Sequence, residues 1–187
     1  MTRVPIPRLS GPPTDGTITL RAWTEADVPA VTRACQDPET QRWTGVPAGY
    51  EEEYARQYIN GREESRRLGE TLDMAVADAH DLAMLGSVGL VKFDAVNRRG
   101  EVGYWVAPHA RGRGVATAAV RLLSAAAFEQ LDLIRLDLIV AVGNVASVRV
   151  AEKAGFTREG VMRSYLATKE HGRDDAVMFG LVRGDAA

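Results

Sequence analysis

A short apolar segment leads into an arginine-flanked glycine loop and then directly into a helix-forming stretch within Glu101–Thr117, EVGYWVAPHARGRGVAT. Gly112 and Gly114 lack a Cβ, so the backbone can turn tightly and bring its N–H groups close to a bound anion. The N-terminus of the following helix adds partial positive charge, while Arg111 and Arg113 add full charges. The segment therefore requires a strand, a loop and a helix in that order, and it predicts a pyrophosphate site.

Two common nucleotide-binding loops do not match this segment. The P-loop needs a lysine after its second glycine, and no lysine stands in this loop. The dinucleotide fingerprint needs glycine or alanine in its third position, where this chain has Thr117. Asp137 lies inside the following predicted strand and not past its end. These mismatches argue against both an NTPase and a dinucleotide-binding enzyme.

A second motif follows the first. Arg111, Gly114 and Ala116 form the pattern R-x-x-G-x-A, and about thirty residues later comes GNVASVRVAEKAGFTREGVMR. Together they resemble the acetyl-CoA site of the GNAT superfamily of N-acetyltransferases, most closely its RimJ/RimL-type branch. The resemblance extends from TITLRAWTEADVPAV near the start to DDAVMFGLV near the end. It implies acetyl-CoA as cosubstrate and a primary amine as acceptor, either a protein N-terminal α-amine or a small molecule such as an amino acid, polyamine or aminoglycoside.

Length and charge limit the remaining choices. The 187 residues, 45% hydrophobic, fit one globular domain over residues 17–187, preceded by a proline-rich extended or mobile arm over residues 1–16. The 23 basic and 25 acidic residues nearly cancel, which argues against nucleic acid as a partner. No apolar run predicts a membrane span or a signal peptide, so a cytoplasmic location is expected. The single Cys35 and three scattered histidines show no metal-ligand spacing.

Apolar periodicity predicts the order of the elements. Strands are expected over 17–21, 72–79, 84–93, 99–106, 136–142, 156–160, 164–168 and 176–182. Helices are expected over 24–36, 51–67, from 115 onward, and over 144–154, with Tyr54, Tyr58 and Ile59 facing inward on the second. Residues 37–50 are expected to be a loop. The fold class is therefore α/β (α+β), with a mixed, largely antiparallel sheet of about seven strands and helices on both faces.

The predicted cofactor site combines the end of a strand, the glycine loop and a later helix. In the resembled family this strand separates from its neighbour, and its free N–H groups bind the cofactor; the alternative is an ordinary inner strand with every N–H paired. Asn144 and Ser147 begin the later helix, where helix capping alone would also explain them. The predicted cofactor-binding residues are Trp105, Val106, Ala107, Arg111, Gly112, Arg113, Gly114, Val115, Ala116, Thr117, Asn144, Ser147 and Lys153.

Amide formation from a thioester needs a neutral amine, a donor for the carbonyl oxygen and a proton for the departing thiolate. Ser147 is the predicted proton donor to the thiolate, with Tyr165 as an alternative donor or acceptor-site residue. Glu101 is the predicted base, acting directly or through water; the alternative is a salt-bridged strand end. His171 could serve as a base if its loop covered the site, although an exposed loop histidine is the simpler interpretation.

Trp43 and Tyr50 are predicted walls of the acceptor pocket, although an isolated buried tryptophan would give the same pattern. Cys35 lies far from the cofactor motifs in the sequence, so transfer is expected without a covalent acyl-enzyme. The rival interpretation is a non-catalytic CoA-binding regulatory module of the same fold. The resemblance also implies a homodimer.

Overall fold

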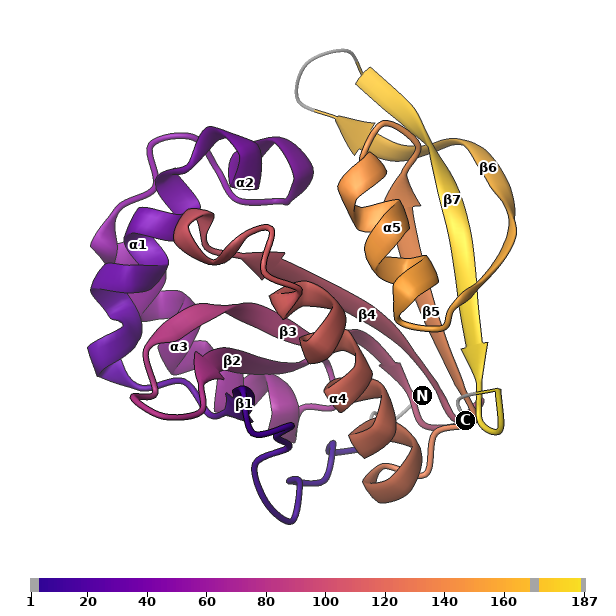
Figure 1. Cartoon of the computed structure of the whole chain (residues 1–187), viewed down its shortest axis with the longest axis horizontal. Helices are drawn as coiled ribbons and strands as arrows, with labels where there is room; N and C mark the ends of the chain where they lie inside the picture. Colours follow the sequence, from indigo (N-terminus) through magenta and orange to yellow (C-terminus); the bar gives the residue numbers. More distant parts are fainter. Residues whose placement is uncertain (1–3, 169–171, 186–187) are drawn as a thin grey trace.

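The computed structural model describes residues 4–168 and 172–185, which contain one seven-stranded sheet. Its strands are β1 (Ile18–Arg21), β2 (Leu72–Asp78), β3 (Met84–Asp94), β4 (Arg99–Val106), β5 (Arg135–Ala141), β6 (Thr157–Thr168) and β7 (Gly172–Val182). They lie in the order β1-β2-β3-β4-β5-β7-β6 (Figure 1). Only β4 and β5 run parallel, and every other neighbouring pair is antiparallel. The predicted fold class is confirmed.

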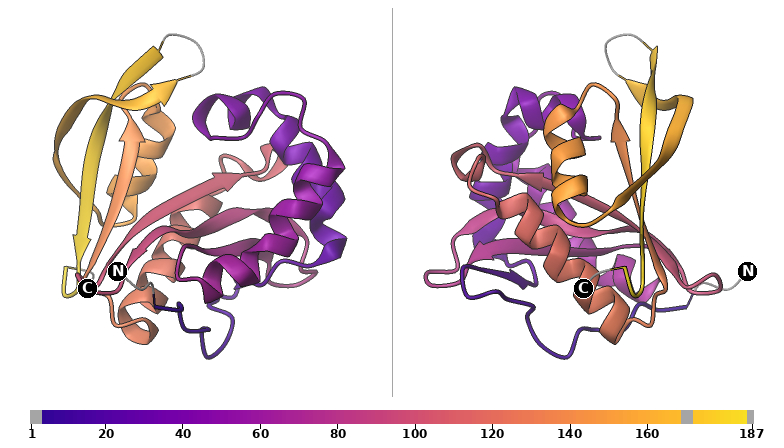
Figure 2. Two further views of the ribbon diagram at one scale, coloured as in Figure 1. Left: turned by 180° about the vertical axis from the view of Figure 1, so that it is seen from behind. Right: turned by 45° about the vertical axis from the view of Figure 1, so that its right-hand side comes forward.

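Helices cover both faces of the sheet. They are α1 (Val28–Gln36), α2 (Pro38–Trp43), α3 (Glu52–Arg67), α4 (Val115–Gln130) and α5 (Val145–Lys153), with short 3-10 helices η1 (Glu25–Asp27) and η2 (Pro108–Ala110). Helices α1 and α3 pack together on one face, as the view from behind shows (Figure 2). Helices α4 and α5 cover the other face.

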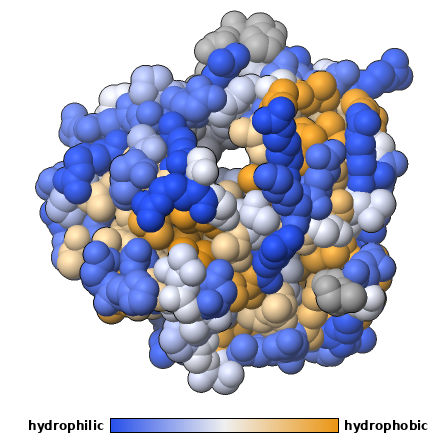
Figure 3. All heavy atoms as spheres, viewed as in Figure 1, coloured by the Kyte–Doolittle hydropathy of each residue, from blue (hydrophilic) through white to orange (hydrophobic). Residues whose placement is uncertain are grey.

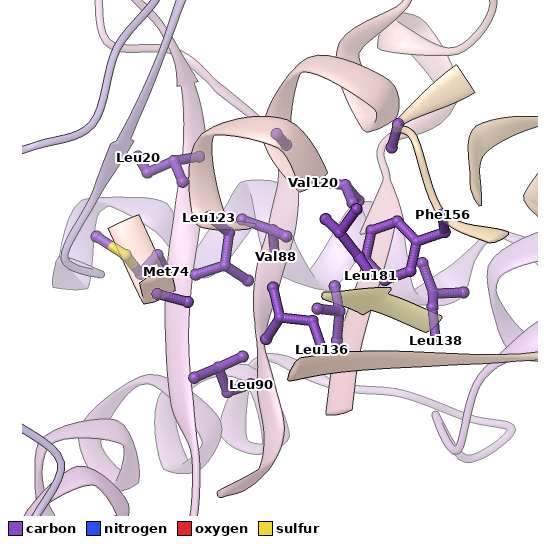
Figure 4. Packing of buried hydrophobic residues seen from close by; sticks show 14 of the residues in the cluster. Leu20, Met74, Val88, Leu90, Val120, Leu123, Leu136, Leu138, Phe156 and Leu181 are labelled. Atoms are coloured by element: carbon purple, nitrogen blue, oxygen red, sulfur yellow. The ribbon is translucent and has the colours of Figure 1, made fainter. Parts of the chain in front are cut away.

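The larger core lies between the sheet and α4. On α4, Val115, Ala119 and Ala126 are buried, because spacings of four and seven keep them on one helical face. Figure 4 shows Leu123 of α4 beside Val88 of β3 within a cluster that continues to β5 and β7. This packing fixes the direction of α4, and therefore the place where its N-terminus meets the glycine loop.

Helix α2 replaces part of the loop expected over residues 37–50, so that expectation was wrong. Asp37 caps the helix, since its Oδ2 accepts a hydrogen bond from the Thr40 N–H at 2.9 Å. Pro38 follows at the first helical position, where its missing N–H costs nothing. The Asp-Pro pair is a helix-start signal that outweighs the turn-forming tendency of the same residues.

Other local expectations also need correction. Two short strands were expected over 156–160 and 164–168, but the structure has one strand, β6, over this region. Its register with β7 shifts between Met162 and Leu166, and this irregularity interrupts the periodicity that suggested two strands. Tyr54 is 49% exposed and does not face inward, whereas Ile59 is buried. Residues 4–16 form neither helix nor named strand, yet Ile6 is fully buried and its N–H donates to the Arg66 carbonyl at 3.0 Å.

Candidate active site

The glycine loop has the backbone geometry that the sequence indicated. Gly112 has φ +75° and Gly114 has φ +79°, a region that L-residues adopt only with strain. A Cβ at either position would meet nothing within 4 Å, so the backbone there faces open space. The first intrahelical bond runs from the Ala118 N–H to the Gly114 carbonyl. The N–H groups of the first turn, at 115–117, therefore lack helical carbonyl partners and face the loop.

A hollow lies beside this helix N-terminus. It has a volume of about 490 Å³, within the roughly 300–1,000 Å³ typical of small-molecule sites. Its lining includes Gly114, Thr117, Arg121 and Lys153. The Arg121 guanidinium donates to the Lys153 carbonyl and so ties α4 to α5. Asp15 also borders the hollow, with its carboxylate accepting the Thr17 and Ile18 N–H groups at 2.9 Å each. These residues fit a bound diphosphate.

The two arginines of the loop differ in their surroundings. Arg111 forms an ion pair with Asp37 at 2.5 Å and donates to the Thr40 hydroxyl at 2.8 Å, so its charge joins α2 to the loop. Arg113 has no ion-pair partner in the parts of the chain that the structure describes, and it lines a second hollow with Gly114. Arg113 is therefore the available loop cation, and phosphate binding by the Arg111 side chain stays a prediction that requires release from Asp37.

The sheet forks between β4 and β5. The two strands pair only at Arg99↔Arg135, Gly100↔Leu136 and Glu101↔Asp137, although β4 continues to Val106 and β5 to Ala141. In the space-filling view an opening passes through the molecule between α2 and α5, above this fork (Figure 3). The separation predicted from the family resemblance is therefore present, and the alternative of an ordinary inner strand is wrong for the end of β4.

Backbone alternation along β4 decides which N–H groups reach the fork. The Ala107 N–H donates to the Leu85 carbonyl at 2.8 Å, so it points toward β3 and is not free. Its neighbour Val106 has the opposite orientation and directs its N–H to the β5 side, as does Tyr104. The Arg111 Nε bonds to the Val106 carbonyl at 3.2 Å. Among the three strand residues predicted to bind cofactor, Val106 is the one whose N–H faces the fork, while Trp105 has the orientation of Ala107.

Asn144 and Ser147 meet at the start of α5, on the other side of the fork. The Asn144 Oδ1 accepts the Ser147 N–H at 3.0 Å, so the predicted helix cap is confirmed. The Ser147 hydroxyl lies 2.5 Å from the hydroxyl of Tyr104 on β4. Burial raises the pKa of Tyr104, and the hydrogen bond with Ser147 only partly offsets this. Ser147 therefore has a second anchor, across the fork, that sequence reasoning did not find.

Glu101, Lys92 and Tyr165 come together at the base of the fork. The Lys92 Nζ bonds to Glu101 Oε2 at 2.6 Å, and this bond raises the pKa of Lys92, with a smaller contribution from the nearby Tyr165. The salt-bridged strand end, left open as an alternative for Glu101, is what the structure contains. A role for Glu101 as base stays a prediction. Tyr165 is 42% exposed on β6, and no hydrogen bond among the described residues joins it to Ser147.

Aromatic side chains occupy the face of the sheet opposite α4. Trp105 stacks on Trp23, with ring centroids 6.3 Å apart. Trp43, half-buried at the end of α2, approaches the loop before α5, since a Cβ on Gly143 would lie 3.4 Å from its ring. Tyr50 is only 7% exposed and packs in the core between α1 and α3, and its role as a pocket wall stays a prediction. Trp43 is thus the better placed of the two predicted pocket walls.

Two residues considered for catalysis, Cys35 and His171, are not among the described residues of this site. Cys35 lies on the buried face of α1, and burial raises the pKa of its thiol to about 11, with the Tyr50 hydrogen bond acting in the opposite direction. His171 lies outside the described residues. No group of three His, Cys, Asp or Glu side chains within residues 4–168 and 172–185 could hold a metal ion.

Comparison with known proteins adds an independent finding. Residues 17–157 match the family model described as the acetyltransferase (GNAT) domain, which is well over half of the chain. The chain belongs to the GNAT acetyltransferase family. Among curated GNAT relatives, a protein named ribosomal N-acetyltransferase YdaF from Bacillus subtilis is 40% identical over 106 residues, 56% of each chain. The chain thus aligns with about half the length of that relative.

Over a shorter alignment of 75 residues, 40% of each chain, this GNAT chain is 37% identical to spermidine N(1)-acetyltransferase of Escherichia coli. Among solved structures, the ribosomal L7/L12 α-N-protein acetyltransferase RimL in complex with coenzyme A has a TM-score of 0.80. The alignment covers 94% of this chain and 98% of RimL at 22% identity, a level that shows a shared fold. The RimJ/RimL-type resemblance is confirmed. Across the described residues, the helices are too short or too polar to cross a membrane.

Sequence reasoning missed several residues of this site, among them Arg121, Tyr104, Asp37 and Trp23. Arg121 lies one helical turn after Thr117, a spacing that could have revealed it. Tyr104 stands in the same strand segment that was singled out for its backbone, but its contact with Ser147 spans 43 positions. Asp37 and Trp23 reach the site through tertiary packing, for which a single sequence carries no signal.

Proposed function

We propose that this chain transfers an acetyl group from acetyl-CoA directly to a primary amine in a ternary complex. One observation carries the proposal: the glycine loop at the N-terminus of α4 follows the end of β4 that is no longer paired with β5. The loop and the hollow beside it suit a diphosphate, and the fork suits the extended pantetheine arm. Ser147 at the start of α5 then lies near the end of that arm.

Two groups of the chain support the chemistry. The amine nitrogen forms a bond to the thioester carbon, and the Val106 N–H can stabilise the negative charge that develops on the carbonyl oxygen. The C–S bond then breaks with its electron pair on sulfur. Ser147 supplies a proton to this thiolate, whose pKa is comparable to the ~8.5 of cysteine. The proton lost by nitrogen passes to solvent, and Ser147 regains one from solvent, so the products are an amide and a neutral thiol.

The acceptor that best fits the fork is a protein N-terminal α-amine. An α-amino group with pKa ~8 is about one-tenth neutral at pH 7, whereas a lysine amine is almost entirely protonated. Because Glu101 is already paired with Lys92, the site favours an acceptor that needs little help from a base. The relatives named for ribosomal-protein acetylation support this choice. Spermidine acetylation by another relative keeps a small polyamine as the second candidate.

An acceptor panel tests the proposal. Purified protein is incubated with acetyl-CoA and one of three acceptors. These are a lysine-containing peptide with a free α-amine, the same peptide with its N-terminus formylated, and spermidine. Thiol release and product mass are measured. The proposal predicts acetylation of the free α-amine, no acetylation of the formylated peptide, and intersecting double-reciprocal lines when both substrates are varied.

Each of the other outcomes of the acceptor panel would contradict a different part of the proposal. Parallel lines together with an acetylated protein would contradict direct transfer. Exclusive acetylation of spermidine would replace the peptide acceptor with a polyamine. Tight binding of acetyl-CoA without turnover of any amine would support the rival interpretation, a non-catalytic CoA-binding module.

A further inference from the structure

The contact between Tyr104 and Ser147 spans the fork in the sheet. Their hydroxyl oxygens lie 2.5 Å apart, although one residue stands on β4 and the other on α5. Tyr104 lies beyond Glu101↔Asp137, the last pair that joins β4 to β5. The two hydroxyls therefore meet where the backbones have separated, at the position proposed for the thioester.

Ser147 is held at two points. Its backbone N–H donates to Asn144 Oδ1 at 3.0 Å, which fixes the main chain, and its hydroxyl meets the Tyr104 hydroxyl. A serine hydroxyl has one proton and two acceptor sites, and it rotates to suit its partners. A phenol is more acidic than an aliphatic alcohol and is the better donor. When Tyr104 donates to Ser147 Oγ, the Ser147 proton is left free for a third group.

The surroundings of Tyr104 keep its proton on the phenol oxygen, where it is available for this bond. Burial, the larger effect, raises the pKa of Tyr104 above its ordinary value, so the phenol keeps its proton throughout the neutral range. A partly buried hydrogen bond is also stronger than one in water, and accepting it makes the serine hydroxyl a better donor. Within the described residues, Ser147 is the only hydrogen-bond partner of the Tyr104 hydroxyl.

We infer that Tyr104 is a positioning residue that donates to Ser147 Oγ and thereby directs the Ser147 proton toward the sulfur of departing CoA. This inference rests on the proposed function. As the C–S bond breaks, its electron pair goes to sulfur and the Ser147 proton bonds to it. The Tyr104 proton stays on the phenol oxygen and moves closer to Ser147 Oγ, which then regains a proton from solvent.

The pKa of the thiol in bound CoA tests the inference without any acceptor. CoA is mixed with excess protein so that nearly all of it is bound, and its alkylation by iodoacetamide is followed against pH by mass spectrometry. Alkylated CoA is separated by mass from any labelled Cys35. A hydrogen bond to the thiolate favours the charged form, so the thiol pKa in the wild-type complex is expected below that of free CoA.

Substitutions separate positioning from a structural contribution. Ser147→Ala is expected to raise the bound-thiol pKa by about one pH unit and Tyr104→Phe by about half of that. Tyr104→Phe should have no effect in a Ser147→Ala background and should regain its effect in a Ser147→Thr background, which keeps the hydroxyl. Tyr54→Phe is the matched control, because Tyr54 lies exposed on α3. In the acetyl-transfer assay, Tyr104→Phe should lower kcat about tenfold with little change in KM for acetyl-CoA.

Three results would overturn the inference alone: a bound-thiol pKa unchanged by Tyr104→Phe, an equal shift in the Ser147→Ala background, or an equal shift with Tyr54→Phe. Failure of the wild-type protein to bind CoA would instead overturn the proposed function, and the inference with it.

Discussion

Gly114 begins α4 with φ +79°, and a Cβ there would meet no atom within 4 Å. Gly114→Ala should therefore fold, with the free energy of unfolding lowered by about 1 kcal/mol because of the left-handed backbone. Acetyl-CoA affinity should fall, since any relaxation of φ turns the first-turn N–H groups away from the phosphates. Calorimetry measures the affinity and denaturant titration the stability.

The control for this change is Gly184→Ala. Gly184 also has positive φ, +104°, and open space around its Cβ position, but it lies outside the site. It should lose similar stability and keep full affinity. An equal loss of affinity in both variants would mean that backbone strain alone, and not the position of Gly114, accounts for the effect.

Cys35 lies on the buried face of α1, and burial raises the pKa of its thiol to about 11. A thiol of that pKa is almost entirely protonated at neutral pH and is a poor nucleophile. Cys35→Ala should keep kcat for acetyl transfer within about twofold, at a cost in stability of about 1 kcal/mol from the lost packing. Abolished transfer by a folded Cys35→Ala protein would contradict direct attack by the amine.

Helix α2 is joined to the glycine loop by Asp37, which caps the helix and pairs with Arg111. Asp37→Ala removes both interactions and should lower the free energy of unfolding by about 1 to 2 kcal/mol. Asp37→Asn keeps the cap and loses the charge, so it should cost only about 0.5 kcal/mol. Equal losses in the two variants would show that the ion pair, and not the cap, supplies the stability.

The ion pair also predicts a pH dependence. Burial alone would raise the pKa of Asp37, but the hydrogen bonds from Arg111 and Thr40 outweigh it and lower the pKa below the ordinary value. A carboxyl with a lowered folded-state pKa stabilises the protein above its unfolded pKa of ~3.9 and loses that contribution as pH falls through the folded value. Denaturant titrations should therefore show the gap between wild type and Asp37→Asn narrowing below about pH 4. A gap that widens in acid would contradict this assignment.

The fork between β4 and β5 leaves the N–H of Val106 directed away from β3, while the N–H of Ala107 donates to Leu85. Hydrogen exchange followed by NMR should find Ala107 protected in the free protein and Val106 exchanging at least tenfold faster. Saturating acetyl-CoA should slow exchange at Val106 and leave Ala107 nearly unchanged. Equal protection of both amides without acetyl-CoA would contradict an open fork.

Much of the molecule could be predicted from the sequence, because its signals are local. The strand, glycine loop and helix stand in one continuous segment, and Asn144 caps α5 within three positions. The contacts of Tyr104 with Ser147 and of Arg111 with Asp37 join residues 43 and 74 positions apart. No periodicity predicts such pairs, because they depend on tertiary packing between elements that are far apart in the chain. The cytoplasmic location, the homodimer and the roles of individual site residues stay predictions.

Both halves of the molecule contribute to the proposed CoA site, with the loop and β4 on one side of the fork and α5 on the other. Calorimetric titration with acetyl-CoA, CoA, NAD and ATP, repeated on Gly114→Glu, tests that site most directly. The wild-type protein should bind acetyl-CoA and CoA with micromolar dissociation constants and bind neither NAD nor ATP, and Gly114→Glu should bind none of the four. Unchanged acetyl-CoA binding by Gly114→Glu, or no binding of either CoA compound by wild type, would contradict the account.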